Sequence, residues 1–132
     1  MDTIGDMLTI IRNGYLSKKR TVVVPFSRMK KELARILQKE GYLDQVQENE
    51  KETRKSKVKI LTLTLRYNEG TPVLTGMKRV SKPGRRVYKG KDEVSRVLGG
   101  MGLTILSTPQ GLMTNRDAKK KALGGEVICI VW

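Results

Sequence analysis

Apolar side chains recur at helical spacing in two stretches of the first half of the chain. In residues 3–16 they fall on every third or fourth position, and Thr3 with Asp6 matches an N-terminal capping box. Residues 28–40 repeat the pattern directly after Ser27, a residue type favoured at the N-cap. The pattern therefore predicts two amphipathic helices.

Extended segments lie between and after these helices. Thr21–Val24 is β-branched and is stopped by Pro25, which predicts a short strand. A second strand is predicted over Tyr42–Val46. In Lys57–Tyr67 leucines alternate with polar residues, the pattern of a strand with one buried face. The polar stretch Gln47–Ser56 between them is expected to form a flexible hairpin tip.

The second half begins with a different pattern. Asn68–Pro72 is a turn or linker and is the best candidate for a boundary between two lobes. Val73–Val80 is predicted to be a strand, and Asp92–Leu98 a short helix. Val127–Trp132 is continuously apolar, which is typical of a central strand covered on both faces.

The stretch before that last strand contains several residues that favour turns and helix ends. An apolar strand leads into Ser107–Gly111, a tight turn that combines two hydroxyls, a proline and a glycine. Thr114 is placed to cap a following helix, with Asp117 three residues later, and Gly124 is expected to take the left-handed position after the helix. A turn held this firmly is a candidate binding site.

The net charge of the chain is its most informative global property, because it indicates the class of binding partner. The chain of 132 residues has 27 Lys and Arg against 13 acids, a net charge of +14. Such a surplus favours a polyanion partner over a surface that is merely soluble, so a nucleic acid is the expected partner. Composition does not choose between RNA and DNA.

The cations are concentrated around one predicted turn. Seven of the fourteen residues from Lys78 to Lys91 are Lys or Arg, and Pro83-Gly84 predicts a type II turn among them. Arg85 and Arg86 are therefore candidates for phosphate contact. Tyr88 is a candidate for stacking on a base, and the alternative for its ring is core packing with the hydroxyl at the rim.

A second candidate contact lies on the predicted helix 28–40. Lys30 and Lys31 crowd its first half, where cations oppose the helix dipole. An external anion would explain that arrangement, so phosphate contact is weighed slightly above a solvated face.

Several chemistries are not supported by the residues. The chain has no histidine, which removes histidine-based acid–base and nucleophilic systems and most zinc sites. The only cysteine, Cys129, lies in the apolar last strand and is expected to be inert. The cluster Gly99–Gly102 lacks the spacing of a nucleotide-binding loop. No catalysis, cofactor, metal or membrane span is expected.

Glu126 stands out as the one acid of the last predicted strand. It follows Gly124-Gly125 and could orient a lysine such as Lys119 or form a local pair. Alternatively it could brace the hydroxyl turn or accept hydrogen bonds from a ribose hydroxyl or a base edge, which would give discrimination more than affinity.

Three tracts carry a resemblance that spans the chain in order. Gly102–Arg116, followed by Gly124–Cys129, looks like the signature of the small-subunit ribosomal protein family numbered eight. Arg79–Tyr88 is similar to the second motif of that family, and Asp6–Asn13 resembles its N-terminal helix. The chain is thus identified as resembling the bacterial or plastid type of this family.

The resemblance implies an α+β fold of two small lobes. Residues 1–70 would form an α/β lobe with two helices and a three-stranded sheet, and residues 71–132 a mainly β, RNA-binding lobe with a short helix. It also implies a structural, non-enzymatic constituent of the small ribosomal subunit in the cytoplasm, or in the plastid stroma. Such a protein is monomeric when free.

The resemblance further implies a primary rRNA-binding protein. It would bind the central domain of 16S ribosomal RNA and help to assemble the platform, beside the ribosomal proteins numbered five and twelve. The RNA contacts implied by matching motifs are the following residues: Ser107, Thr108, Gly124, Gly125 and Glu126, with Arg85, Arg86, Tyr88, Lys30 and Lys31 as additional contacts.

One departure from the family pattern falls in the turn. The family commonly has serine where this chain has Pro109, so a side-chain hydroxyl and a backbone N–H are both lost there. The leading hypothesis is a ribosomal RNA-binding protein that recognises shape. A free-standing nucleic-acid-binding module, such as a translational repressor, is the alternative, and an enzyme is a distant third.

Overall fold

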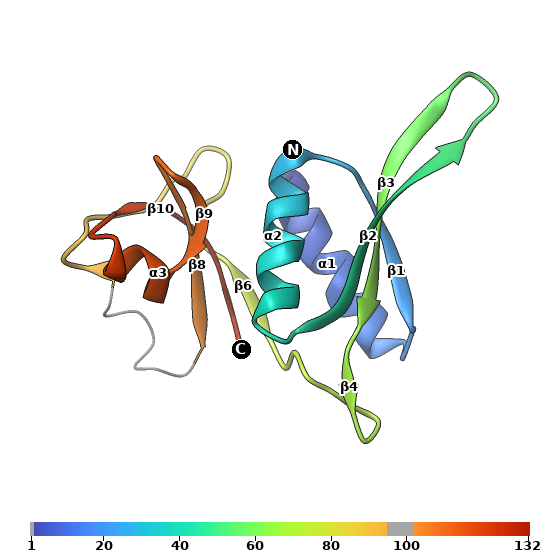
Figure 1. Ribbon diagram of the computed structural model, residues 1–132, viewed down its shortest axis with the longest axis horizontal. Coiled ribbons are helices and arrows are strands. Elements are labelled where there is room, and N and C mark those ends of the chain that lie inside the picture. The colour runs from blue at the N-terminus through green and yellow to red at the C-terminus, as the bar shows by residue number, and fades with distance from the viewer. Residues whose placement is uncertain (1, 95–101) are drawn as a thin grey trace. The chain divides into compact units, whose positions relative to one another are not determined.

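The structure, a computed structural model, describes residues 2–94 and 102–132. It divides into two compact units, which we call the N-terminal unit (Asp6–Val73) and the C-terminal unit (the residues up to Gly5 together with Leu74–Trp132). The elements of the first part of the chain are α1 (Thr3–Leu16), β1 (Thr21–Pro25), α2 (Arg28–Lys39), β2 (Leu43–Glu52), β3 (Lys57–Leu65), β4 (Tyr67–Asn68) and β5 (Thr71–Pro72) (Figure 1).

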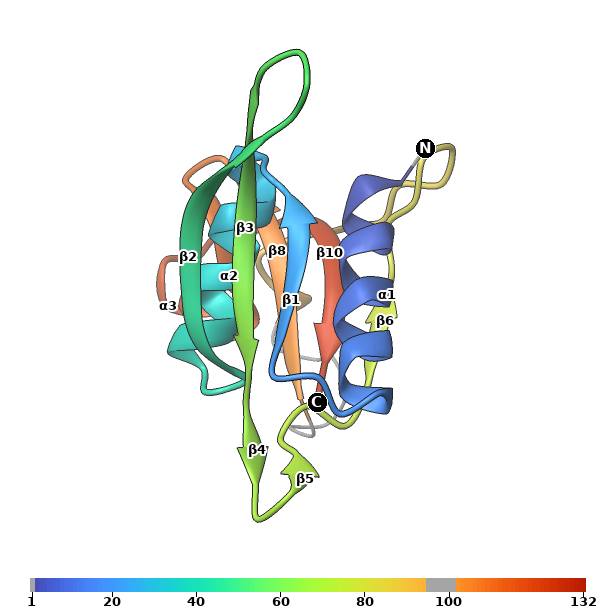
Figure 2. The ribbon, with the colours of Figure 1, turned by 90° about the vertical axis from the view of Figure 1, so that its right-hand side faces the viewer.

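The N-terminal unit is built on an antiparallel sheet of strand order β1-β3-β2. Both helices lie on one face of this sheet (Figures 1 and 2). The predicted alternation of β3 is confirmed, because Leu61, Leu63 and Leu65 are buried while the residues between them are not. Leu33 and Leu37 of α2 are fully buried as well. Burial of this leucine-rich layer is the main driving force that holds the unit together.

The two helix starts differ in how well the sequence predicted them. Ser27 caps α2 as predicted, and its hydroxyl accepts a hydrogen bond from the Lys30 N–H at 3.1 Å. The prediction that Thr3 caps α1 is wrong. The carboxylate of Asp2 takes that position and accepts from the Gly5 N–H at 3.1 Å. An aspartate fits there because its charge also complements the helix dipole.

The predicted flexible tip over Gln47–Ser56 is wrong for most of its length. β2 continues to Glu52 in unbroken register with β3, although its last six side chains are all exposed. Oppositely charged residues stand opposite each other there, with Glu50 facing Lys59 and Glu52 facing Lys57. Backbone pairing and these cross-strand pairs extend the ladder where no core supports it.

The C-terminal unit is built on a second antiparallel sheet. Its elements are β6 (Met77–Arg79), β7 (Tyr88–Lys89), β8 (Leu103–Thr108), β9 (Gly111–Thr114), α3 (Asn115–Lys120) and β10 (Gly125–Val131). The strand order is β6-β10-β8-β9, and β7 also pairs with β10. The prediction of a central last strand is confirmed, and so is the α+β fold class. The core is a cluster of Val94, Leu106, Met113, Ala118 and Val127.

One strand prediction for this unit was too long, and one helix prediction extends beyond the described residues. Only Met77–Arg79 of the predicted strand Val73–Val80 pairs in the sheet, because the segment before it turns back on the chain end, where Thr75 and Gly76 donate to the Trp132 carbonyl. The predicted helix Asp92–Leu98 runs into residues 95–98, which lie outside the described residues, as does most of the Gly99–Gly102 cluster.

The end of α3 corrects another prediction. Ala122, with φ of 54°, takes the left-handed position that was expected of Gly124. The Leu123 N–H donates to the Ala118 carbonyl at 2.9 Å and the Ala122 N–H to that of Lys119 at 3.1 Å, the paired bonds of a Schellman motif. The chain tolerates an alanine at a position that favours glycine.

Candidate nucleic-acid interface

Three predicted site residues stand side by side across three strands. Glu126 of β10 pairs with Tyr88 of β7 on one side and with Ser107 of β8 on the other. Directly paired residues project from the same face of a sheet. The register therefore aligns a phenol ring, a carboxylate and a hydroxyl in what we call the cross-strand row.

The members of the row differ in exposure. The Tyr88 side chain is 68% exposed, which rules out core packing, the alternative weighed for its ring. Ser107 and Glu126 are half-buried. A ring standing free beside a carboxylate and a hydroxyl offers one surface for stacking and two groups for hydrogen bonding.

Gly124 and Gly125 allow the strands to approach closely at this point. A Cβ atom on Gly125 would lie 2.1 Å from the Ser107 carbonyl oxygen, and one on Gly124 would lie 2.4 Å from that of Lys89. Both distances are much shorter than a van der Waals contact, and the atoms that would clash belong to the backbone, which cannot easily move aside. The two glycines are therefore required for the row to form, whatever it binds.

Arg86 is held against the row by an ion pair. Its Nη1 lies 3.2 Å from Oε2 of Glu126, so the partner of this carboxylate is Arg86 and not Lys119, the candidate named from the sequence. Arg86 remains exposed. The pair fixes the orientation of a carboxylate that keeps further acceptor positions for a ligand.

The basic turn is built as its sequence predicts. Lys82 and Arg85 form an isolated β-bridge around Pro83-Gly84, and Gly84 has φ of 83°, as the third position of a type II turn requires. Arg85 is exposed beside it. The turn thus presents cations on a fixed backbone.

Ser81 anchors this turn and was not singled out from the sequence. It is fully buried, and its hydroxyl accepts from the Val87 N–H at 2.8 Å and donates to the Val87 carbonyl at 3.2 Å. The Val87 carbonyl also accepts from the Val127 N–H at 2.9 Å, which ties the basic turn to β10. A serine directly before a basic turn was the only signal available.

Thr108 has a structural role within the hydroxyl turn. Its hydroxyl donates to the Gly111 carbonyl at 2.8 Å and accepts from the Gln110 N–H at 3.1 Å, and the residue is 9% exposed. Pro109 and Gln110 form the two-residue turn between β8 and β9. Gly111 follows with φ of 108°, which favours glycine. Proline is compatible with this turn, and Thr108 shapes it.

Lys30 and Lys31 lie on α2 of the N-terminal unit, and both ammonium groups are engaged. Lys30 is only 6% exposed and its Nζ donates to the Pro25 carbonyl at 3.4 Å. Lys31 pairs with Glu48 at 2.9 Å, and this pairing lowers the pKa of the Glu48 carboxyl. These partners explain the two cations without an external anion.

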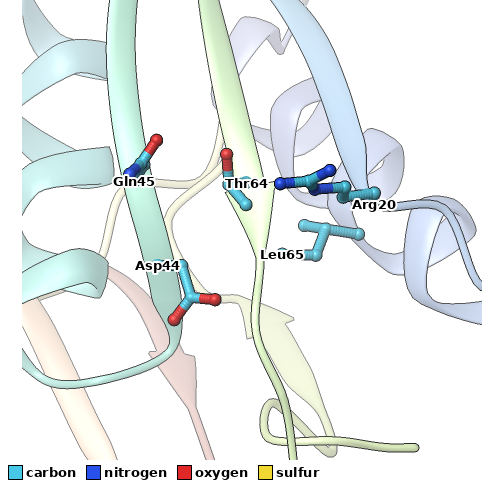
Figure 3. Close-up of a pocket in the computed structure, with 5 residues that line it drawn as sticks. All are labelled: Arg20, Asp44, Gln45, Thr64 and Leu65. Carbon is cyan, nitrogen blue, oxygen red and sulfur yellow. The ribbon is translucent and has the colours of Figure 1, made fainter.

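The rest of the described chain offers little for catalysis. A shallow pocket of about 420 Å³ in the N-terminal unit is lined by Arg20, Asp44, Gln45, Thr64 and Leu65, and contains no nucleophile paired with a base (Figure 3). Burial raises the pKa of the Cys129 thiol to about 12. Within residues 2–94 and 102–132, no acids or thiols cluster as metal ligands. None of the described helices is long and apolar enough to cross a bilayer.

Comparison with known proteins gives a consistent result. A family model described as ribosomal protein S8 matches residues 2–132. The chain is 51% identical over 132 residues to a small ribosomal subunit protein uS8 from Caldanaerobacter subterraneus subsp. tengcongensis, covering 99% of this chain and 97% of that protein. Proteins of the same name from Trichormus variabilis and Acinetobacter baumannii are 44% and 47% identical, again over 96% or more of each chain.

Proposed function

The chain belongs to the ribosomal protein S8 family, and from this premise we propose that it is a structural constituent of the small ribosomal subunit that binds 16S ribosomal RNA directly. Its task is structural and not catalytic, and its place is the ribosome, which in bacteria is cytoplasmic. The observation that carries the proposal is the cross-strand row of Tyr88, Glu126 and Ser107 beside an exposed basic turn.

The proposed mechanism divides the contacts into two kinds. Arg85 and Arg86 neutralise phosphates and position the protein on the RNA without reading its sequence. The row then reads a non-helical or minor-groove feature. Tyr88 stacks on an unpaired base, the Glu126 carboxylate accepts from a ribose 2′-hydroxyl or a base amino group, and the Ser107 hydroxyl donates or accepts beside it.

The remaining predicted contacts take supporting roles in this proposal. Gly124 and Gly125 support the row, because without side chains they let the neighbouring backbone of Lys89 and Ser107 approach closely. Thr108 holds the shape of the turn. Lys31 is half-buried and would have to exchange Glu48 for a phosphate, while the buried Lys30 supports the fold. RNA binding is therefore assigned mainly to residues 71–132.

The partners follow from the proposed place in the subunit. The RNA target is the central domain of 16S ribosomal RNA, where the protein would help to assemble the platform. The ribosomal proteins numbered five and twelve are the proposed protein neighbours, and the free chain is a monomer.

Sedimentation tests the proposal. The chain should remain with small subunits through a high-salt gradient, because contacts of the row do not depend on counterion release. A chain found only in the free pool would instead support a free-standing RNA-binding module.

The double variant Arg85→Ala, Arg86→Ala provides the matched binding measurement. It should weaken binding to all RNAs and make the slope of log affinity against log salt shallower by roughly one to two. An unchanged slope would remove both residues as phosphate contacts.

A further inference from the structure

The sheet of the N-terminal unit has a second face, opposite the helices, that carries no charged residue over three consecutive rows. Residues from β1, β3 and β2 stand abreast in each row. We call these rows the outer sheet face. The first row consists of Thr21, Thr64 and Gln45, the second of Val23, Thr62 and Gln47, and the third of Pro25, Ile60 and Asn49.

This face is open to solvent. All residues of the two edge strands in it are exposed, including Val23 at 50%, and the three residues of the central strand are half-buried. Its polar groups are amides and hydroxyls, and the Thr62 hydroxyl donates to the Asn49 side-chain oxygen at 2.9 Å. The face therefore presents β-branched carbon and neutral hydrogen-bonding groups together.

Neutrality over this area is unusual for the chain. Its sequence is 30% charged with a net charge of +14, yet nine surface-facing positions carry no formal charge. Charge begins only at the margins, at Lys51 in the next row of the ladder and at Arg20 and Asp44 around the shallow pocket. Figure 3 shows Gln45, Thr64 and Arg20 in line across β2, β3 and the start of β1.

The absence of cations decides what kind of partner fits. A surface that contacts RNA needs Lys or Arg to neutralise phosphates, and this face has none. Protein interfaces are instead depleted of charge at their centre and combine apolar area with satisfied hydrogen bonds. The neutral face with a charged margin matches the arrangement of a protein interface.

We propose that the outer sheet face docks a neighbouring protein of the small subunit through an uncharged, partly apolar surface of that protein. The proposal rests on the proposed membership of the subunit and adds a division of labour to it. The C-terminal unit contacts RNA, and this face of the N-terminal unit contacts protein.

The substitution Val23→Lys distinguishes a protein-binding face from an RNA-binding face. A lysine on an RNA-binding face would leave RNA affinity unchanged or raise it, whereas a lysine at the centre of a protein interface is desolvated without a partner. We expect unchanged binding to isolated ribosomal RNA and a loss, on the order of tenfold, in retention of a neighbouring protein in reconstituted subunits. Normal retention of every neighbour would overturn the proposal.

Val58→Lys is the matched control. Val58 is similarly exposed, at 43%, but it lies on the hairpin extension opposite Lys51 and outside the three rows. It makes the same chemical change on β3, outside the three rows, and it should leave all neighbours in place. An equal loss from both variants would mean that the effect is not specific to the face.

A thiol placed at Gln47 identifies the occupant. The native Cys129 is fully buried, so Gln47→Cys provides the one accessible thiol among the described residues. In assembled subunits we expect a heterobifunctional cross-linker at this thiol to give a protein adduct that survives ribonuclease. An adduct lost on ribonuclease treatment, or a thiol that reacts as fast in subunits as in the free chain, would overturn the proposal. Failure of the chain to enter subunits at all would instead refute the proposed function.

Discussion

Arg86 and Glu126 form an ion pair at the start of the central strand of the C-terminal unit, with 3.2 Å between Nη1 and Oε2. The pair joins the most basic turn of the chain to the single acid of its last strand. The carboxylate is mostly shielded from water and the guanidinium is half-exposed, with side-chain exposures of 18% and 48%. A fixed acid within a basic surface favours discrimination between RNAs over affinity for all of them.

Glu126→Gln should therefore reduce specificity and spare general affinity. The amide keeps the shape but loses the charge, and Arg86 is released. We expect the preference for the specific ribosomal RNA over an unrelated RNA to fall by about 1–3 kcal/mol. Non-specific affinity should hold or rise. Filter binding across a salt series measures both quantities.

Glu48→Gln is the control for this experiment. Glu48 is also ion-paired, with Lys31 at 2.9 Å, but it belongs to the N-terminal unit and is not a member of the proposed row. Its substitution should leave the preference unchanged. Equal effects of the two variants would show that bulk charge, and not the position of Glu126, controls specificity.

Removing the two hydroxyls of the turn one at a time should have different effects, on RNA binding for Ser107 and on stability for Thr108. Ser107→Ala should weaken specific RNA binding by about 1–3 kcal/mol with little change in stability or salt slope. Thr108→Val should lower the free energy of unfolding by about 1–2 kcal/mol. The substitution removes the hydroxyl that bonds the Gly111 carbonyl and the Gln110 N–H in a nearly buried turn. Urea unfolding and RNA binding of both variants decide the matter. The reverse pattern would exchange the roles assigned to the two residues.

The helices, strands, caps and turns that depend on neighbouring residues could be predicted from the sequence. Helical spacing located α1 and α2, alternation located β3, and an apolar run marked β10 as central, because each pattern reflects burial of one face or both. The turn at Gly84 and the caps at Ser27 and Thr114 were also predictable, since each depends on residue types within a few positions.

What the sequence could not supply is long-range register. That Tyr88, Glu126 and Ser107 share one row depends on pairing between segments up to 38 residues apart, which no local pattern records. The same holds for the Arg86 partner of Glu126 and for the burial of Lys30, whose charge suggested exposure. The exposed end of β2 was missed because it is held by pairing and not by burial.

Helix ends provide a test of backbone strain. The helices α2 and α3 end in the same pair of hydrogen bonds, but the left-handed residue is Gly41 in one and Ala122 in the other. Ala122→Gly should raise the free energy of unfolding by about 0.5–1 kcal/mol, and Gly41→Ala should lower it by about 1 kcal/mol. Urea unfolding of both variants measures the changes. Opposite signs from those expected would contradict the strain argument.

Cys129 predicts a pH dependence. Burial raises the pKa of its thiol from 9.0 to about 12, so the folded protein favours the protonated thiol. The stabilisation is complete below pH 9.0 and is lost progressively as pH rises toward 12. The difference in unfolding free energy between the wild type and Cys129→Ala should therefore shrink above pH 9.0, and native Cys129 should resist alkylation at pH 8. A constant difference, or rapid alkylation of the native chain, would contradict this.

A photoreactive phenylalanine in place of Tyr88 shows whether the cross-strand row contacts ribosomal RNA in the assembled subunit. The ring at this position is 68% exposed, so the replacement does not disturb the core. After irradiation of assembled small subunits, we expect a cross-link from position 88 to 16S ribosomal RNA in its central domain. A cross-link only to protein, or none in subunits that contain the chain, would contradict it.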